Sequence, residues 1–326
     1  MKDHLLEIKD LKVSFFTPAG EVKAVNGVSY DLDEGRVLGI VGESGSGKSV
    51  SVSAMMQLLA YPGRVVGGSI TFNGQDVLAM NPEQIQAVRG KDIGMVFQDP
   101  MTSLNPVFTI GDQLTETLLR HTKLNHSEAW DRSVEMLKLV GINNPEQRMK
   151  QYPHEFSGGM RQRAMIAMTL LCNPKLLIAD EPTTALDVTI QAKIMDLMKR
   201  LREKFNAAII LITHDLGIVS DICDDVIVMY AGRIVEHGET AALFEKPLHP
   251  YTRGLLRSVA SLRAGGETLQ TIPGVVPNLL HLPKGCAFSL RCDQCGADCE
   301  ANAPEFREIA PGHFARCFLA EKEGEE

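Results

Sequence analysis

A glycine-rich segment from Gly42 to Ser49 constrains this chain more than any other feature, because it lies between a predicted buried strand and a predicted helix. Its sequence fits the pattern G-x-x-x-x-G-K-S/T. Glycines leave room for backbone N–H groups to wrap around phosphates, and the helix start adds the positive end of its dipole. The residues predicted to contact phosphates are Gly42, Ser44, Gly45, Ser46, Gly47, Lys48 and Ser49. The alternative is a chance glycine turn, which the strand, the helix and a downstream acidic pair argue against.

Within this loop Lys48 is expected to reach the β- and γ-phosphates, and Ser49 to ligate Mg²⁺. The acidic pair, Asp180 and Glu181, ends a second apolar run at the carboxyl edge of the predicted sheet. There Asp180 is a natural Mg²⁺ partner, and Glu181 can act as a general base toward an attacking water. The alternative is an N-capping acidic pair before Pro182.

The order of apolar and amphipathic segments predicts an α/β fold, because β-branched runs alternate with helical patterns. The opening segment, 6–32, alternates apolar and polar residues around a Pro-Ala-Gly turn and predicts an antiparallel hairpin. A helix is expected from Lys48 to about Leu59. Buried strands are expected at 37–41, 176–179, 208–212 and 226–230.

Two further segments depart from this alternation. From about 101 to 169 the pattern turns helical, which predicts an inserted helical subdomain. After Lys246 the chain becomes richer in Pro, Gly and Cys, so long regular elements are not expected there. We therefore predict a main domain over 1–245 and a C-terminal extension over 246–326.

Charge and hydropathy narrow the class of protein. The formal net charge of −8 argues against a surface built mainly for nucleic acid, which would need a basic stripe. No apolar run reaches the roughly 18–20 residues that cross a bilayer, and the N-terminus lacks a signal peptide. We therefore expect a cytoplasmic protein whose association with a membrane runs through a partner.

Two polar residues follow other predicted strands. His214 comes after the strand at 208–212, where it could bond the γ-phosphate and hold the attacking water. A histidine in such a place is often structural, but Thr213-His214-Asp215 lies where a third residue of the sheet edge is expected. Gln98 follows another apolar run and could touch Mg²⁺ or the water. It also opens the helical insertion, so it could couple the nucleotide state to that subdomain.

A second anion-binding helix start is predicted at Ser157, Gly158 and Gly159. A serine hydroxyl and glycine amides at a helix N-terminus form such a cradle. One phosphate chain does not need two cradles from the same polypeptide. The surplus predicts two protomers, each of which closes the other's nucleotide site.

In order and spacing these motifs resemble those of the ATP-binding-cassette (ABC) ATPases, over about residues 5–245. The resemblance implies an α/β P-loop NTPase fold with an antiparallel β subdomain and a helical subdomain, which hydrolyses ATP with Mg²⁺. It implies catalytic roles for Lys48, Gln98, Glu181 and His214, and nucleotide contacts for Ser157, Gly158, Gly159, Asp180, Asp187 and Phe15. Phe16 is the alternative to Phe15 as the residue that stacks on adenine. The chain departs from the family pattern at Met160, where many members have Gln, and at Phe156, where many have Leu.

The C-terminal part is similar to the extension of oligopeptide and dipeptide importer ATPases, most of all the D-type subunits of bacterial dipeptide permeases. The resemblance is carried by 246–256 and by Ile-Pro-Gly-Val-Val-Pro at 272–277. It implies a peptide importer at the cytoplasmic face of the inner membrane. The implied partners are a homologous ATPase in a heterodimer, two membrane-spanning permease subunits and an extracytoplasmic binding protein, with no nucleic acid.

Five of the seven cysteines lie between Cys286 and Cys317, in a loop-rich segment. In a cytosolic chain such a cluster indicates metal or cluster ligation before disulfides. Several members of the importer subfamily carry a [4Fe-4S] cluster, and the positions that match are Cys286, Cys292, Cys299 and Cys317. Zinc is the alternative, because it favours short pairs such as Cys292-x-x-Cys295. Free or disulfide-forming thiols are the third possibility.

Other functions fit the sequence less well. The same machinery could import another small solute, such as glutathione, a nickel complex or haem. A soluble cassette ATPase acting on nucleic acid or ribosomes usually has two cassettes or a long coiled-coil insertion, and this chain has neither. An electron-transfer protein would not need the complete ATP site.

Overall fold

The computed structural model describes residues 4–98, 103–183, 188–263 and 271–323. The chain divides into two compact units. The first comprises Met1–Leu32, Val37–Ala79 and Thr213–Glu326, and the second comprises Asp33–Arg36 and Met80–Ile212.

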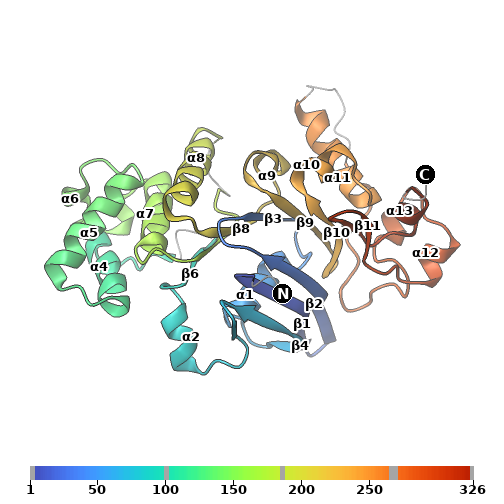
Figure 1. Ribbon diagram of the computed structural model, residues 1–326, viewed down its shortest axis with the longest axis horizontal. Coiled ribbons are helices and arrows are strands. Elements are labelled where there is room, and N and C mark those ends of the chain that lie inside the picture. The colour runs from blue at the N-terminus through green and yellow to red at the C-terminus, as the bar shows by residue number, and fades with distance from the viewer. Residues whose placement is uncertain (1–3, 99–102, 184–187, 264–270, 324–326) are drawn as a thin grey trace. The chain divides into compact units, whose positions relative to one another are not determined.

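An antiparallel sheet in the first unit confirms the predicted hairpin. Its strands, in the order β2-β1-β4-β5, are β1 (Leu6–Thr17), β2 (Gly20–Leu32), β4 (Gly63–Phe72) and β5 (Gln75–Asp76). The turn between β1 and β2 is closed where Thr17 pairs with Gly20, and the Thr17 hydroxyl donates to the Gly20 carbonyl at 2.9 Å. Figure 1 shows β1, β2 and β4 side by side.

The first unit also contains five neighbouring strands of a larger mixed sheet. Their order is β11-β12-β10-β9-β3. Their bounds are β3 (Val37–Val41), β9 (Asp225–Tyr230), β10 (Arg233–Glu239), β11 (Arg307–Ala310) and β12 (His313–Ala315). The pair β3–β9 is parallel and the other pairs are antiparallel. Every residue of β3 is buried, as its unbroken apolar sequence predicts.

Strand β3 leads through the glycine loop into helix α1 (Lys48–Met55). The helix begins at the predicted residue but ends short of the predicted Leu59. The chain leaves the helix because Gln57 adopts a left-handed conformation, with φ of 49°.

Three parallel strands form the sheet of the second unit, in the order β8-β7-β6. They are β6 (Ile93–Val96), β7 (Leu176–Asp180) and β8 (Ala208–Ile212). The second unit also holds helices α2 (Pro82–Val88) and α8 (Val188–Phe205). The predicted strands at 176–179 and 208–212 are thus confirmed.

The predicted helical insertion is confirmed over its described residues. It contains α4 (Ile110–His121), α5 (His126–Leu139), α6 (Pro145–Arg148), η1 (Pro153–Glu155) and α7 (Gly158–Leu170). Figure 1 shows α4, α5, α6 and α7 gathered into one bundle. The starts of α4 and α5 are fixed by reciprocal capping boxes, Thr109 with Asp112 and Asn125 with Glu128.

The expectation that the C-terminal extension lacks long elements is wrong. Helix α11 (Pro250–Arg263) has 14 residues. Pro250 opens this helix, where its missing N–H has no intrahelical partner to lose. The remaining helices of the first unit are short: α9 (Leu216–Ile222), α10 (Thr240–Glu245), η2 (Ser289–Arg291), α12 (Ala297–Ala301) and α13 (Phe318–Glu323). In the part of the chain that the structure describes, no helix combines the length and apolar character that a membrane span requires.

Candidate functional site

The phosphate loop connects β3 to α1, in the strand–loop–helix context that the motif requires. All three of its glycines have positive φ: Gly42 at 151°, Gly45 at 77° and Gly47 at 100°. A β-carbon on Gly42 would lie 2.2 Å from the Met229 backbone oxygen, and one on Gly47 would lie 2.4 Å from that of Ala24. Other residues are therefore excluded at both positions by backbone conformation and by space.

Lys48 folds back onto its own loop. Its Nζ donates to the Gly42 carbonyl at 2.8 Å and to the Glu43 carbonyl at 3.0 Å, and the residue is 6% exposed. The Ser46 hydroxyl is buried in the same loop and has no hydrogen-bond partner among the described residues. Both groups suit a loop that receives an anionic ligand.

His214 lies in the first unit, in the segment that enters α9. The Thr213 N–H donates to the Ile40 carbonyl of β3 at 3.3 Å, so this segment runs beside the strand that leads to the phosphate loop. The Asp215 side chain caps α9 by accepting from Gly217 N at 2.8 Å. His214 itself is exposed.

In the second unit, Gln98 and Glu181 come together. Gln98 Nε2 donates to Glu181 Oε2 at 2.9 Å, although 83 residues separate them. Glu181 has φ of 46°, a left-handed conformation that non-glycine residues rarely adopt and that is often found at functional sites. Asp180, the last residue of β7, is 7% exposed.

The predicted second cradle is a true helix start. Ser157 is the N-cap of α7, and its hydroxyl accepts from Met160 N at 3.4 Å. A β-carbon on Gly158 would meet no atom within 4 Å, so the space in front of the helix start is open among the described residues. Behind it, Gln162 donates to the Pro182 carbonyl at 2.6 Å and ties α7 to the segment after Glu181.

The two candidate adenine-stacking residues differ in exposure. The Phe15 ring packs closely against Gly63, whereas Phe16 is 47% exposed with the Arg64 guanidinium 5.9 Å from its ring centroid. Asp187, the remaining nucleotide contact predicted from the sequence, lies outside the described residues.

Four cysteines of the C-terminal extension line one small cavity. They are Cys286, Cys292, Cys299 and Cys317, and Cys295 lies outside it. Burial raises the pKa of Cys286 to about 11 and raises the pKa of Cys292 and Cys317. Four cysteine side chains are the donor set of an iron–sulfur cluster, but among the described residues no three His, Cys, Asp or Glu side chains lie close enough together to hold a metal ion.

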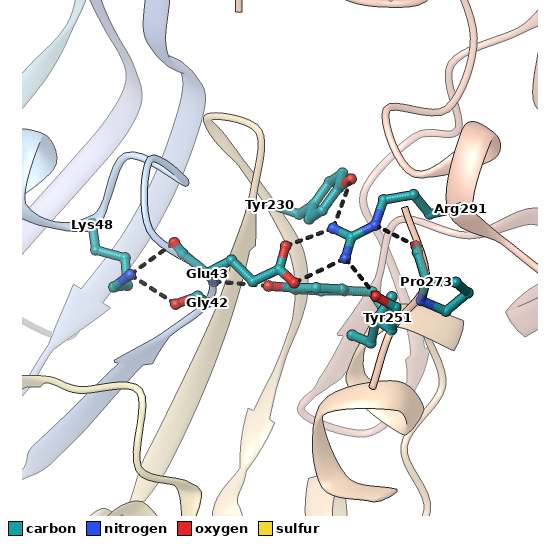
Figure 2. A network of polar contacts seen from close by, with 8 residues as sticks. Gly42, Glu43, Lys48, Tyr230, Tyr251, Pro273 and Arg291 are labelled. Atoms are coloured by element: carbon teal, nitrogen blue, oxygen red, sulfur yellow. Dashed lines mark hydrogen bonds and ion pairs between the residues drawn. The ribbon is translucent and has the colours of Figure 1, made fainter. Parts of the chain in front are cut away.

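Sequence reasoning missed a set of contacts around Glu43, which occupies a variable position of the loop motif. Figure 2 shows two of these contacts. Arg291 pairs with the Glu43 carboxylate, and the Tyr251 hydroxyl accepts a hydrogen bond from the Glu43 backbone N–H. Arg291 stands beside Cys292 in the cysteine-rich segment, 248 residues from Glu43. No local pattern could have joined residues so far apart.

Comparison with protein families gives two matches. The model described as "ABC transporter" matches residues 25–184. The model described as "Oligopeptide/dipeptide transporter, C-terminal region" matches residues 235–299.

Similar proteins cover nearly the whole chain. The oligopeptide transport ATP-binding protein OppD of Escherichia coli (strain K12) is 55% identical, over 97% of this chain and 93% of its own length. The dipeptide transport ATP-binding protein DppD of Bacillus subtilis (strain 168) is 48% identical, over 99% of this chain and 97% of its own.

Solved structures share the fold. The ATP-binding cassette MJ0796, solved as a dimer bound to ADP and Pi, aligns with a TM-score of 0.65 at 25% identity and covers 72% of this chain and 98% of its own. The cbiO1 protein of Clostridium perfringens, described as part of an ABC transporter complex, aligns with a TM-score of 0.65 at 28% identity, over 81% of this chain and 97% of its own. These alignments confirm the α/β P-loop fold predicted from the sequence.

Proposed function

This chain belongs to the ABC transporter ATPases with an oligopeptide/dipeptide transporter C-terminal region, and on that premise we propose that it powers peptide import by hydrolysing ATP. The observation that carries the proposal is the phosphate loop, with its left-handed glycines and its buried Lys48, in a chain 55% identical to an oligopeptide transport ATP-binding protein.

The proposed reaction is attack of water on the γ-phosphate of ATP. Lys48 binds the β- and γ-phosphates, and the N-terminus of α1 adds its dipole. Ser49 and Asp180 are the residues that would hold Mg²⁺, and the ion would supply positive charge to neutralise the phosphates. Glu181 accepts the proton of the attacking water, and its hydrogen bond from Gln98 orients that carboxylate.

Four further groups complete the assignment. His214 is proposed to hold the water at the γ-phosphate, and an aromatic side chain at Phe15 or Phe16 to stack on adenine. Asp187 contributes to the nucleotide site. The start of α7 is proposed to bind the nucleotide held by a second ATPase protomer, through Ser157, Gly158 and Gly159. ATP bound in this way would hold the two protomers together as a closed dimer.

The assembly follows from this assignment. An importer ATPase works with membrane-spanning permease subunits and as a dimer of cassettes. We propose that the second cassette is a homologous chain, that an extracytoplasmic binding protein delivers the peptide, and that this subunit sits peripherally at the cytoplasmic face of the membrane. The domain division that we propose is 1–245 for the nucleotide-binding domain, with 101–169 as its helical subdomain, and 246–326 for the extension.

We further propose that Cys286, Cys292, Cys299 and Cys317 hold a [4Fe-4S] cluster, with zinc as the alternative. Four thiols around one cavity support this assignment. The local apolar core is small, comprising Leu248, Ala315, Cys317 and Ala320 with Ile309 and Leu319 against it. A cluster bound there would cross-link a segment with little core of its own.

The function is tested by purifying the tagged chain from membranes, identifying the proteins that accompany it, and reconstituting the assembly in liposomes. The proposal expects permease subunits in the preparation and ATP-dependent uptake of labelled peptide, which Lys48→Ala abolishes. Recovery of the chain with RNA or ribosomes instead would refute it. Iron and zinc analysis of the same sample decides between the two metals, and Cys286→Ser should lower the content of the one that is found.

A further inference from the structure

The C-terminal extension contributes two side chains to the phosphate loop. Arg291, from η2, and Tyr251, from α11, both bind Glu43, the second residue of the loop (Figure 2). All of these residues belong to the first unit. The loop that is proposed to hold ATP is therefore held in place by residues of the C-terminal extension, outside the nucleotide-binding domain.

Arg291 makes a paired contact with the Glu43 carboxylate. Its two terminal nitrogens lie 2.6 Å from Oε2 and 3.0 Å from Oε1 of Glu43. The Arg291 side chain is 4% exposed, and that of Glu43 is 28% exposed. A two-pronged ion pair shielded from water fixes both position and orientation, which a single surface contact does not.

Arg291 is itself held in place by its surroundings. It donates to the carbonyls of Ile272 at 3.2 Å and Pro273 at 3.0 Å, and its guanidinium lies over the rings of Tyr230 and Phe288. The hydrogen bonds that Arg291 donates to the Glu43 carboxylate raise the pKa of Arg291, burial lowers it, and the effect of the hydrogen bonds is the larger. The guanidinium therefore stays charged and rigidly placed.

Tyr251 fixes the backbone of the same loop residue. Its hydroxyl accepts from Glu43 N at 2.8 Å, and the residue is fully buried. The Tyr251 ring packs against Tyr230, with centroids 4.7 Å apart, and against Phe288 at 5.4 Å. Because Tyr230 ends β9 and Phe288 precedes η2, the aromatic cluster joins the sheet to the extension.

These contacts use all the polar groups of Glu43. Its carboxylate is paired with Arg291, its N–H with Tyr251 and its carbonyl with Lys48, which also binds Gly42. A loop rich in glycine loses much conformational entropy when it orders around phosphates. Residues that order it beforehand remove part of that cost from binding.

We propose that Arg291 and Tyr251 are positioning residues for the phosphate loop, through which the C-terminal extension sets the affinity of the subunit for MgATP. The inference rests on the proposed function of the loop. Neither residue touches the nucleotide in this scheme, since both act through Glu43. The expected signature is a higher KM for ATP with little change in kcat.

A simpler role is that the pair only fastens the extension to the cassette. The chain offers a matched control for this, because Arg316 also joins the extension to a cassette strand. Its Nε donates to the Ile234 carbonyl of β10 at 3.0 Å, and it contacts Pro304 and the Phe306 ring. An Arg316→Gln variant loosens the extension without touching the loop.

The experiment compares full-length variants in the reconstituted transporter, measuring KM and kcat for MgATP together with thermal stability. Displacement of trinitrophenyl-ATP from the full-length chain gives the affinity directly. Arg291→Gln and Glu43→Gln should each raise KM about tenfold, and the double variant should be no worse than either alone, because both single variants break the same pair. Tyr251→Phe removes only the acceptor of the Glu43 N–H and should raise KM by a smaller factor. Arg316→Gln should lower stability and leave KM unchanged.

Three results would separate the possible failures. If Lys48→Ala abolishes turnover but Arg291→Gln, Glu43→Gln and Tyr251→Phe leave KM and the displacement affinity unchanged, the positioning role is refuted and the proposed function stands. If Arg316→Gln raises KM as much as Arg291→Gln, the rise in KM comes from loosening the extension as a whole, and the inference fails. If Lys48→Ala leaves turnover intact, the proposed function of the loop fails with it.

Discussion

Replacing Glu236 by Gln should weaken the attachment of the C-terminal extension to strand β10. Glu236 is fully buried. Its Oε1 accepts from Leu248 N at 2.7 Å and lies 2.9 Å from His313 Nε2, and its Oε2 accepts from His249 N at 2.8 Å. One carboxylate therefore fixes the segment that enters α11 and the strand β12.

The magnitude follows from these three contacts. Gln keeps the shape of Glu but carries one oxygen and one NH₂ group, so in either orientation an NH₂ group faces a backbone N–H. The variant loses one hydrogen bond to a charged group, worth roughly 1.5–3 kcal/mol, and leaves a buried N–H unsatisfied, which costs roughly 1–3 kcal/mol. Because the site relaxes in part, we expect a net loss of about 3 kcal/mol of local opening free energy.

Hydrogen exchange of the Leu248 and His249 amides in the full-length chain measures this local free energy. A loss of about 3 kcal/mol corresponds to exchange that is faster by about two orders of magnitude. The control is Glu245→Gln, which removes an exposed acid from the same region and should leave these amides unchanged. Unchanged exchange in Glu236→Gln, with the protein folded, would show that the carboxylate charge does not fix this segment.

Three further outcomes follow from the structure. Gly47 has a φ of 100°, and a β-carbon on it would lie 2.4 Å from the Ala24 backbone oxygen. Gly47→Ala should therefore abolish binding of trinitrophenyl-ATP. Binding at the original affinity would contradict the loop geometry. Burial lowers the pKa of His249, whose Nδ1 accepts from Tyr251 N at 3.0 Å, from 6.5 to about 4. As the pH falls, the unfolded chain therefore binds a proton at this histidine at a higher pH than the folded chain does. The free energy of unfolding should drop by about 3 kcal/mol between pH 6.5 and 4. Denaturant titrations at several pH values measure this drop, and His249→Gln should reduce it. Glu181→Gln in the reconstituted transporter should reduce ATP turnover by roughly 10²–10⁴-fold while trinitrophenyl-ATP still binds, whereas undiminished turnover would refute the assigned base.

Much of the fold could be predicted because its signals are local. A fully buried strand such as β3 needs an unbroken apolar run, and the alternation of β1 and β2 marks a sheet with two different faces. The phosphate loop is equally local, since its glycines are required by the φ values of single residues. The start of α7 was predictable because a serine N-cap acts within one helical turn.

Other features depend on partners that the sequence does not place. The hydrogen bond between Gln98 and Glu181 exists only because β6 and β7 pair in parallel and bring the segments that follow them to one edge. Helix α11 is not evident from the sequence because proline usually breaks helices, but Pro250 lies in the first turn, where it does not interrupt hydrogen bonding. The Arg291 pair with Glu43 joins segments 248 residues apart in the sequence, and only the folded chain reveals it.

The buried contacts of the extension form one continuous path within the first unit. Glu236 holds the backbone of His249, the His249 ring accepts from Tyr251 N, and the Tyr251 hydroxyl holds the Glu43 N–H. Each link is a hydrogen bond among buried or half-buried groups, where the loss of one partner leaves the other unsatisfied. The contacts that attach the extension to the first unit's sheet therefore also restrain the phosphate loop. Arg316 attaches the extension at a different place, the Ile234 carbonyl. The contact of Arg316 and the path that ends at Glu43 can therefore be broken separately. A change in ATP affinity is expected only when the path to Glu43 is broken.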